Sequence, residues 1–250
     1  MNTTRNTVLI TGGATGIGYC LAEEFLKAGN KVIICGRREE KLNEAERRLP
    51  EIHTYVCDVS SPGDREGLYN WVTSNFKDIN ILVNNAGIQR MIDLKAGLRD
   101  LRANENELDI NLGSTIHLSA CFIPEFMKRS EAAIINVSSG LGFVPIAIMP
   151  VYCATKAAIH SFTISLRHQL KNTSVKVFEI IPPTVDTDLD KGARAGRGQT
   201  FRGIPPSEVA VSTMTALAKD EFEHGVGQAQ NLVAAASQSG FYEQFNRMNH

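Results

Sequence analysis

The chain has 250 residues, 43% of them hydrophobic, so it can bury one large core and is expected to form a single domain over residues 1–250. Its 26 basic and 27 acidic residues are interspersed and leave a formal net charge of −1. A chain without a basic field is not expected to bind nucleic acid or an anionic membrane surface.

The cysteines and the apolar stretches indicate the compartment. The five cysteines are widely spaced and form neither a CxxC pair nor a Cys/His cluster, so we expect reduced core thiols and no metal site. Residues 1–7 are polar and leave no room for the apolar region of a signal peptide. Residues 141–154 are interrupted by two prolines and are shorter than the roughly 18 residues of a membrane span. We therefore expect a cytoplasmic protein with no membrane span.

In chain order, short apolar runs alternate with longer stretches of helical periodicity. This alternation predicts an α/β fold: a doubly wound parallel sheet of about seven strands, of the Rossmann type, with helices on both faces. Ligands of such sheets bind beyond the carboxyl ends of the strands. The runs predict strands at 8–11, 31–35, 53–57, 79–84, 132–138, 175–181 and, more weakly, 225–229. The stretches predict helices at 18–28, 38–49, 62–76, 104–129, 151–170 and 207–219.

A glycine-rich turn lies between the first predicted strand and the first predicted helix. Its glycines let a backbone approach a pyrophosphate, and the start of the helix offers free N–H groups and a positive dipole end. The alternative is an ordinary strand–helix turn. The candidate cofactor-binding residues of this turn are Gly12, Ala14, Thr15, Gly16, Ile17 and Gly18.

Tyr152 and Lys156 are four residues apart in a predicted helix, so their side chains share one face. A phenol has a pKa near about 10 in water, and a neighbouring ammonium lowers that pKa toward the range of proton exchange with a carbonyl or alcohol oxygen. Ser139, thirteen residues upstream of Tyr152, would hold that oxygen. A Tyr and a Lys at this spacing are more often a solvated pair, but Ser139 and the glycine turn favour hydride-transfer chemistry.

These motifs, with Asn84-Asn85-Ala86-Gly87 after the fourth strand and Asn111 in the next helix, resemble the short-chain dehydrogenase/reductase family over residues 7–230. The resemblance implies that Tyr152 exchanges the substrate proton and that Lys156 lowers its pKa and binds the nicotinamide ribose. It implies that Ser139, selected over Ser138 by strand alternation and spacing, steadies the carbonyl oxygen. The resemblance further implies that Asn111 holds a proton-relaying water and that Asn85, Ala86 and Gly87 contact the cofactor.

The end of the second strand bears on the choice of cofactor. The sequence there is Gly36-Arg37-Arg38, where a family member that uses NAD usually carries Asp or Glu at the position of Gly36. A basic residue pairs with the 2′-phosphate of NADP, so NADP(H) is favoured over NAD(H), with Arg37 and Arg38 as candidate contacts. The alternative is that both arginines begin an amphipathic helix and are neutralised by Glu39 and Glu40.

Asp58-Val59, after the third strand, matches the family's adenine-contacting pair. The alternative role of this segment is capping of the following helix by Asp58 or Ser60, which is compatible with the first.

After the sixth strand the family usually shows Pro-Gly, whereas this chain has Pro182-Pro183. By resemblance, Pro182, Val185 and Thr187 still contact the cofactor. The paired prolines and residues 226–230 resemble a branch of the family associated with D-alanine esterification of teichoic acids.

Two regions are expected to shape the substrate pocket. Residues 188–206 are rich in Gly, Arg and Pro and predict a mobile lid, whose basic residues suit either an anionic substrate or, more simply, a solvated loop. The aromatic residues of the tail at 239–250 suit a cover for the pocket or for a second subunit. Predicted helices 104–129 and 151–170 are apolar on more than one face, which predicts a homodimer or homotetramer.

The sequence therefore predicts an NADP(H)-dependent oxidoreductase that interconverts a carbonyl and a secondary alcohol of a small molecule, with Tyr152 as general acid/base. The alternative is a non-catalytic NADP(H)-binding redox sensor, which would not need the proton donor. Substrate and direction depend on the lid and the tail, where the pattern is weakest.

Overall fold

The computed structural model describes residues 1–101, 106–190, 203–236 and 247. The lid prediction falls mainly on residues 191–202, and the tail prediction falls on 239–250. Apart from residue 247, these segments lie outside the described residues. Within the described ranges, no helix combines the length and the apolar character needed to cross a bilayer.

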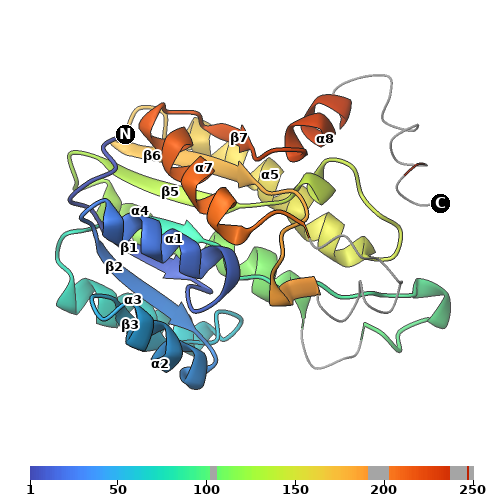
Figure 1. Ribbon diagram of the computed structural model, residues 1–250, viewed down its shortest axis with the longest axis horizontal. Helices are drawn as coiled ribbons and strands as arrows, with labels where there is room; N and C mark the ends of the chain where they lie inside the picture. The colour runs from blue at the N-terminus through green and yellow to red at the C-terminus, as the bar shows by residue number, and fades with distance from the viewer. Residues whose placement is uncertain (102–105, 191–202, 237–246, 248–250) are drawn as a thin grey trace.

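Seven strands form one parallel sheet through the middle of the molecule (Figure 1). Their order is β3-β2-β1-β4-β5-β6-β7, so the chain builds outward from β1 to one edge and then from β4 to the other. This order confirms the doubly wound sheet predicted from the sequence. The strands are β1 (Thr7–Thr11), β2 (Lys31–Gly36), β3 (His53–Val56), β4 (Ile79–Asn84), β5 (Ala132–Val137), β6 (Val175–Ile181) and β7 (Glu223–Gly225).

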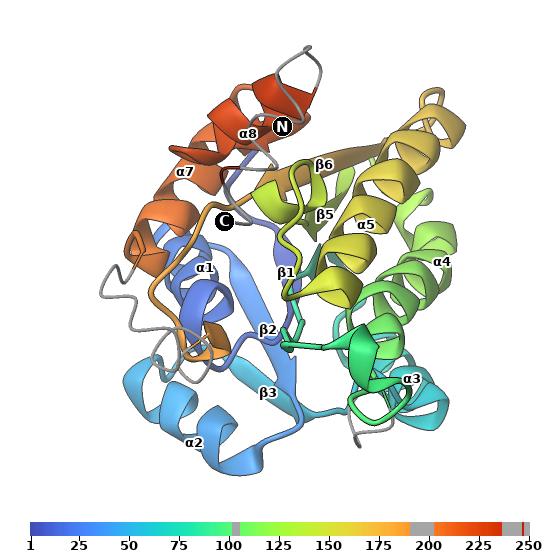
Figure 2. The ribbon, with the colours of Figure 1, turned by 90° about the vertical axis from the view of Figure 1, so that its right-hand side faces the viewer.

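Helices cover both faces of the sheet, which Figure 2 shows nearly edge-on. Helices α1, α2 and α7 lie on one side, and α3, α4 and α5 lie on the other. The helices are α1 (Gly16–Lys27), α2 (Glu39–Arg48), α3 (Pro62–Asn75), α4 (Ser114–Phe126), α5 (Pro150–Gln169), α7 (Pro206–Ala218) and α8 (Ala229–Ala236).

Strand β1 shows why the sequence forms two cores. All five of its residues are buried, because both faces of the sheet are covered. Successive side chains point to opposite faces, so Val8 and Ile10 enter the core beneath α1 and α7, whereas Leu9 enters the core beneath α3 and α4.

The neighbouring strands β1 and β4 lead into loops that run to opposite faces of the sheet, and hydrogen bonds of one threonine side chain join the ends of the two strands. The buried Thr11 donates a hydrogen bond from Oγ1 to the Val83 carbonyl, at 3.3 Å. The same oxygen accepts hydrogen bonds from the backbone N–H groups of Asn85 and Ala86, both at 3.0 Å. These bonds fix the two loops at the switch in strand order, where ligands of open α/β sheets bind.

The last strand differs from the prediction. The weak strand expected at 225–229 ends at Gly225, and α8 begins at Ala229. A tight turn separates them, with Gly227 in the left-handed region at φ 52° and the Ala229 N–H bonded to the Val226 carbonyl. The apolar run therefore spans the end of a strand, a turn and the start of a helix.

The helix predicted at 104–129 also differs. Helix α4 covers Ser114–Phe126 and follows a π-helical turn at Leu108–Gly113. A π turn adds one residue to the helical repeat, so a 3.6-residue pattern does not reveal it. The buried Asn111 lies within this π turn.

The burial of α7 predicts a difference between two valines of the same helix. Val209 is fully buried, whereas Val211 is 52% exposed. V209A removes two buried methyl groups and leaves a cavity, so the free energy of unfolding should fall by about 2 kcal/mol. V211A makes the same deletion in solvent and should change it by less than about 0.5 kcal/mol. Urea unfolding at fixed protein concentration measures both, and equal losses would contradict the packing of α7.

Candidate functional site

A cavity of about 1310 Å³ lies beyond the carboxyl ends of the strands, at the switch between β1 and β4. It brings together residues that are distant in the sequence. Of the sequence-predicted cofactor and catalytic residues, Gly18 and Asn111 do not line it. Those that do are Gly12, Ala14, Thr15, Gly16, Ile17, Arg37, Arg38, Asp58, Val59, Asn85, Ala86, Gly87, Ser139, Tyr152, Lys156, Pro182, Val185 and Thr187.

The glycine turn has the geometry of an anion cradle. Gly12 and Gly16 adopt left-handed φ values of 64° and 56°, which glycine tolerates best. A Cβ on Gly18 would lie 2.3 Å from the Gly12 carbonyl oxygen, so the turn closes directly on the first turn of α1. The Thr15 side chain makes no capping hydrogen bond and the first turn of α1 carries no acidic residue. The N–H groups there suit a phosphate.

At the end of β2, Arg37 and Arg38 are both exposed and border the cavity. Arg38 also occupies the N-cap position of α2. The two guanidinium groups provide positive charge at the border of the cavity, which suits an anionic ligand group.

Asp58 lies on the same side of the cavity, after β3. Its Oδ1 accepts hydrogen bonds from the backbone N–H and the hydroxyl of Ser60, at 2.9 and 2.7 Å. Burial raises the pKa of Asp58, but the Ser60 hydrogen bonds and the charge of Arg37 outweigh it, so that the pKa is lowered. The residue that caps α3 is Ser61, whose hydroxyl accepts from the Asp64 N–H, so the capping alternative predicted for Asp58 or Ser60 is wrong.

Tyr152 and Lys156 lie on the first turns of α5, both 5% exposed. The Lys156 Nζ lies 5.7 Å from the centre of the Tyr152 ring and donates a hydrogen bond to the Val137 carbonyl at 2.8 Å. Burial lowers the pKa of Lys156 to about 8, although the negative charge of Glu179 opposes the shift. The cavity wall therefore holds a buried phenol beside a buried amine whose pKa is lowered to about 8.

Ser139 reaches the same cavity from the end of β5. Its Oγ accepts a hydrogen bond from the Leu141 N–H at 3.1 Å and caps a short 3₁₀ turn at Gly140–Gly142. A Cβ on Gly142 would lie 2.8 Å from the carbonyl carbon of Lys156, so this turn packs directly on α5. The neighbouring Ser138 Oγ is buried and has no hydrogen-bond partner among the described residues.

Asn111 lies behind the cavity wall in the π-helical turn and is fully buried. Its Oδ1 accepts from the Ile88 N–H at 2.8 Å, and its Nδ2 donates to the Ile88 carbonyl at 2.9 Å and to Thr155 Oγ1 at 3.1 Å. The side chain thus joins the loop after β4 to α5, next to Lys156.

The segment after β6 closes the cavity opposite α5. Thr184 and Asp186 form backbone hydrogen bonds with Ile204, which places Val185 in a parallel bridge to that residue. A Cβ on Gly16 would lie 3.1 Å from the Thr187 methyl group. The paired prolines are therefore compatible with contact between this segment and the glycine turn.

Helix α8 borders the cavity through Asn231 and Leu232, two residues that belong to none of the sequence motifs. A Cβ on Gly140 would lie 2.6 Å from Leu232 Cδ1, so α8 packs against the turn that carries Ser139. Leu232 and Val233 among alanines are typical of a helix, and this signal was available in the sequence.

The close contact between Gly18 and Gly12 predicts that one added methyl group at Gly18 weakens ligand binding. G18A should force the turn away from α1 and weaken binding of a nicotinamide dinucleotide at least about tenfold, because the phosphate cradle is displaced. G63A is the control, since a Cβ on Gly63 in α3 meets nothing within 4 Å. Titration with NADPH, followed by nicotinamide fluorescence, measures both, and equal affinities would contradict the cradle.

Comparison with known proteins gives consistent matches. The family model described as short chain dehydrogenase matches residues 6–198. The protein named "Uncharacterized oxidoreductase DltE" of Bacillus subtilis is 47% identical over 249 residues, covering 100% of this chain and 98% of its own. This match confirms the branch to which the paired prolines and residues 226–230 pointed. "NADP-dependent 3-hydroxy acid dehydrogenase YdfG" of Salmonella typhi is 35% identical over 181 residues, 71% of this chain and 72% of its own.

Solved structures share the fold. A short chain dehydrogenase from Burkholderia cenocepacia in complex with NADP has a TM-score of 0.84 at 26% identity and covers 99% of both chains. A short chain dehydrogenase/reductase from Burkholderia phymatum in complex with NAD has a TM-score of 0.85 at 21% identity, covers 100% of this chain and 97% of its own, and shows the fold alone. The doubly wound sheet, the match over residues 6–198 and the full-length relative establish that the chain belongs to the short-chain dehydrogenase/reductase family.

Proposed function

We propose that the protein is an NADP(H)-dependent oxidoreductase that interconverts a carbonyl and a secondary alcohol, with Tyr152 as general acid/base. The observation that carries this proposal is the meeting of Ser139, Tyr152 and Lys156 at one wall of a cavity whose other end holds the glycine turn. Membership of an oxidoreductase family supports the reaction class.

In this proposal the protein moves the proton. The Lys156 ammonium, 5.7 Å from the Tyr152 ring, stabilises the phenolate and so lowers the pKa of the phenol. In carbonyl reduction Tyr152 donates its proton to the substrate oxygen, and in alcohol oxidation it accepts that proton. Ser139 Oγ holds the oxygen in place during the transfer. Asn111 holds the loop after β4 against α5 beside this pair and, as the family resemblance implies, positions a water for the onward relay.

The residues present fit a dinucleotide. The cavity of about 1310 Å³ exceeds the roughly 300–1,000 Å³ of ordinary small-molecule pockets, and Gly12 and Gly16 line it with backbone that carries no side chain. Ala86, Gly87 and Val185 also line the cavity. When bound, the nicotinamide supplies the hydride chemistry.

Preference for NADP(H) rests on Arg37 and Arg38 at the end of β2. Both residues border the cavity, the charge of Arg37 acts on Asp58, and the two guanidinium groups would pair with a 2′-phosphate. The YdfG relative, named NADP-dependent, and the structure that holds NADP support this choice.

The mechanism predicts the effect of removing one hydroxyl. Y152F keeps the ring but deletes the proton donor, so kcat should fall by roughly 10²–10⁴ while NADPH binding is retained. The assay follows reduced-nicotinamide absorbance with a panel of ketones, aldehydes and alcohols. The panel includes 3-hydroxybutyrate, because the YdfG relative is named for 3-hydroxy acids.

The control is Y69F, because the Tyr69 ring lies outside the cavity and packs edge-to-face against Phe122, with ring centroids 5.3 Å apart. Near-normal turnover of Y152F would reject the mechanism. A wild-type protein that binds NADPH but turns over no member of the panel would favour the redox sensor.

Cofactor preference is tested by reversing one charge. R37D should lower the ratio of NADPH to NADH affinity by about tenfold or more, because a charge-assisted hydrogen bond contributes roughly 1.5–3 kcal/mol. R47D makes the same change on the exposed side of α2, away from the cavity, and should leave the ratio unchanged. An unchanged ratio in R37D would remove the basis for NADP(H).

We also propose a homodimer or homotetramer formed through the outer faces of α4 and α5. Ile116 on α4 and Ile164 on α5 are 37% and 45% exposed. These large apolar side chains lie on two helices that cover the same face of the sheet, where they suit contact with a second subunit. I164E should shift the mass measured by light scattering to that of a monomer, whereas V211E, an equally exposed site on α7, should not. A monomeric wild type would reject this assembly.

A further inference from the structure

A row of polar side chains crosses four strands of the sheet one layer below the cavity. Asn84, Asn136, Glu179 and Glu223 pair in register on β4, β5, β6 and β7. Asn84 Nδ2 donates to Asn136 Oδ1 at 2.9 Å. Asn136 Nδ2 donates to Thr163 Oγ1 on α5, also at 2.9 Å, so the row faces α5. Polar residues in the interior of a parallel sheet are costly unless they are bonded, and this row therefore calls for an explanation.

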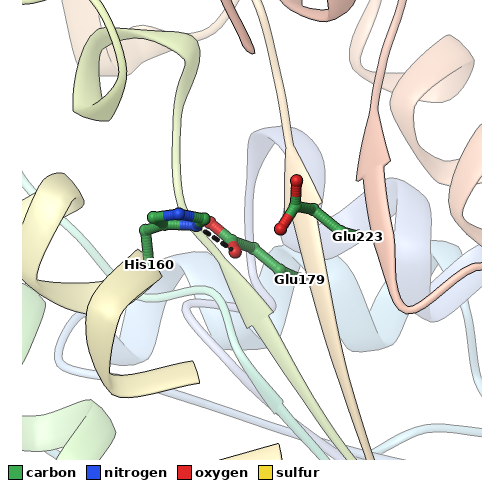
Figure 3. A group of neighbouring side chains, drawn as sticks. All are labelled: His160, Glu179 and Glu223. Carbon is green, nitrogen blue, oxygen red and sulfur yellow. Dashed lines mark hydrogen bonds and ion pairs between the residues drawn. The ribbon is translucent and has the colours of Figure 1, made fainter. Parts of the chain in front are cut away.

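Glu179 is the charged residue at the centre of this row. Its side chain is fully buried, and its Oε2 lies 2.8 Å from His160 Nδ1 (Figure 3). Its Oε1 has no hydrogen-bond partner among the described residues. His160 is itself 26% exposed, and its ring packs against Phe143 at 4.4 Å. One carboxylate oxygen is thus fixed by the imidazole, and the other is buried without a hydrogen bond in the described part of the chain.

The fixed carboxylate lies close to the catalytic wall. His160 follows Lys156 by one turn of α5, so both side chains share a face of that helix. Lys156 Nζ is anchored on the carbonyl of Val137, and Val137 follows Asn136, the register partner of Glu179. The negative charge of Glu179 raises the pKa of Lys156 against the larger, opposite effect of burial.

We propose that Glu179, oriented by His160, is a positioning residue that keeps Lys156 in its ammonium form and through it makes Tyr152 acidic. The inference rests on the proposed function in one respect, the role of Tyr152 as proton donor. Glu179 acts through Lys156 and touches neither substrate nor cofactor.

The other charged groups around His160 and Glu179 do not take over the effect of Glu179 on Lys156. On α5, Arg167 donates to the carbonyls of Val177 and Phe222, and on β7 the exposed Glu223 faces His160. The hydrogen bond that His160 donates to Glu179 is the largest influence on the pKa of His160 and raises it. His160, Glu179 and Glu223 place ligand atoms within 4.8 Å of one another, an arrangement that also suits a divalent cation. Positive charge from Arg167 beside both carboxylates disfavours a cation.

The test reads the titration of Tyr152 without any substrate. The phenolate of Tyr152 is followed by ultraviolet difference absorbance against pH, with Y152F in the same background as the blank. In E179Q, Lys156 loses its proton at lower pH and no longer stabilises the phenolate, so the apparent pKa of Tyr152 should rise by about one unit. Loss of the direct repulsion from Glu179 acts the other way. Its effect is smaller, because Lys156 is one turn from Tyr152 on α5, whereas His160, the partner of Glu179, is two turns from it.

Two further variants separate this role from a structural one. H160Q leaves the carboxylate but removes the group that orients it, and should shift the Tyr152 titration in the same direction by a smaller amount. This variant carries the test if E179Q does not fold, as judged by thermal unfolding. E221Q is the matched control, because Glu221 forms the same kind of pair with His224 Nδ1, at 2.7 Å, away from the cavity. E221Q should leave the titration unchanged.

The result that overturns the proposal is an unchanged Tyr152 titration in folded H160Q, and in E179Q if it folds. A wild-type titration that changes on treatment with EDTA, and is restored by Zn²⁺ or Mn²⁺, would assign the three residues to a cation and overturn it as well. Absence of turnover with the carbonyl and alcohol panel would reject the proposed function but leave this titration readable, so the two failures are distinguishable.

Discussion

The site depends on one constraint, the parallel pairing of β1 with β4. Because parallel strands share one direction, every strand delivers its following loop to the same edge of the sheet. The loops after β1 and β4 then leave toward opposite faces, and the space between them is the cavity. Thr11, bonded to Val83, Asn85 and Ala86, holds this opening at a fixed width. Residues more than a hundred positions apart therefore meet without any long insertion.

The chemistry of the cavity follows from the burial of one amine. An ammonium taken out of water loses solvation, and the hydrogen bond from Lys156 to the Val137 carbonyl restores part of that loss. The remaining cost lowers its pKa to about 8. At that pKa the protonated fraction of the lysine near neutral pH depends on the charges around it. The buried carboxylate of Glu179 therefore bears on the protonated fraction of Lys156.

The row from Asn84 to Glu223 shows how the sheet holds such a charge. Asparagines on β4 and β5 bond to each other and to hydroxyl groups of α4 and α5, which satisfies most of their polar atoms. Glu179 continues the row but is bonded through only one oxygen in the described structure. A neighbouring cation compensates a buried charge of this kind, and Lys156 and Arg167 on α5 carry the compensating charges.

Periodicity and motif spacing in the sequence determined the alternation of strands and helices, and with it the parallel sheet and the edge at which the site lies. They also determined the glycine turn and the pair Tyr152 and Lys156, because these depend on neighbours within a few residues. The turn between β7 and α8 was missed because an apolar run of five residues suits a strand and a helix equally well. The π turn at Asn111 was missed because it breaks the helical repeat by one residue.

Tertiary structure alone decided which distant groups meet. The sequence places Glu179 in an apolar run, where it reads as an isolated polar residue, and places His160 on a helix face among small and apolar residues. Only the register of β6 against β5 and the packing of α5 on that face bring the two within 2.8 Å of each other and beside Lys156. The local sequence pattern indicates which face of a helix or strand a residue occupies, whereas electrostatic coupling depends on distances across the sheet.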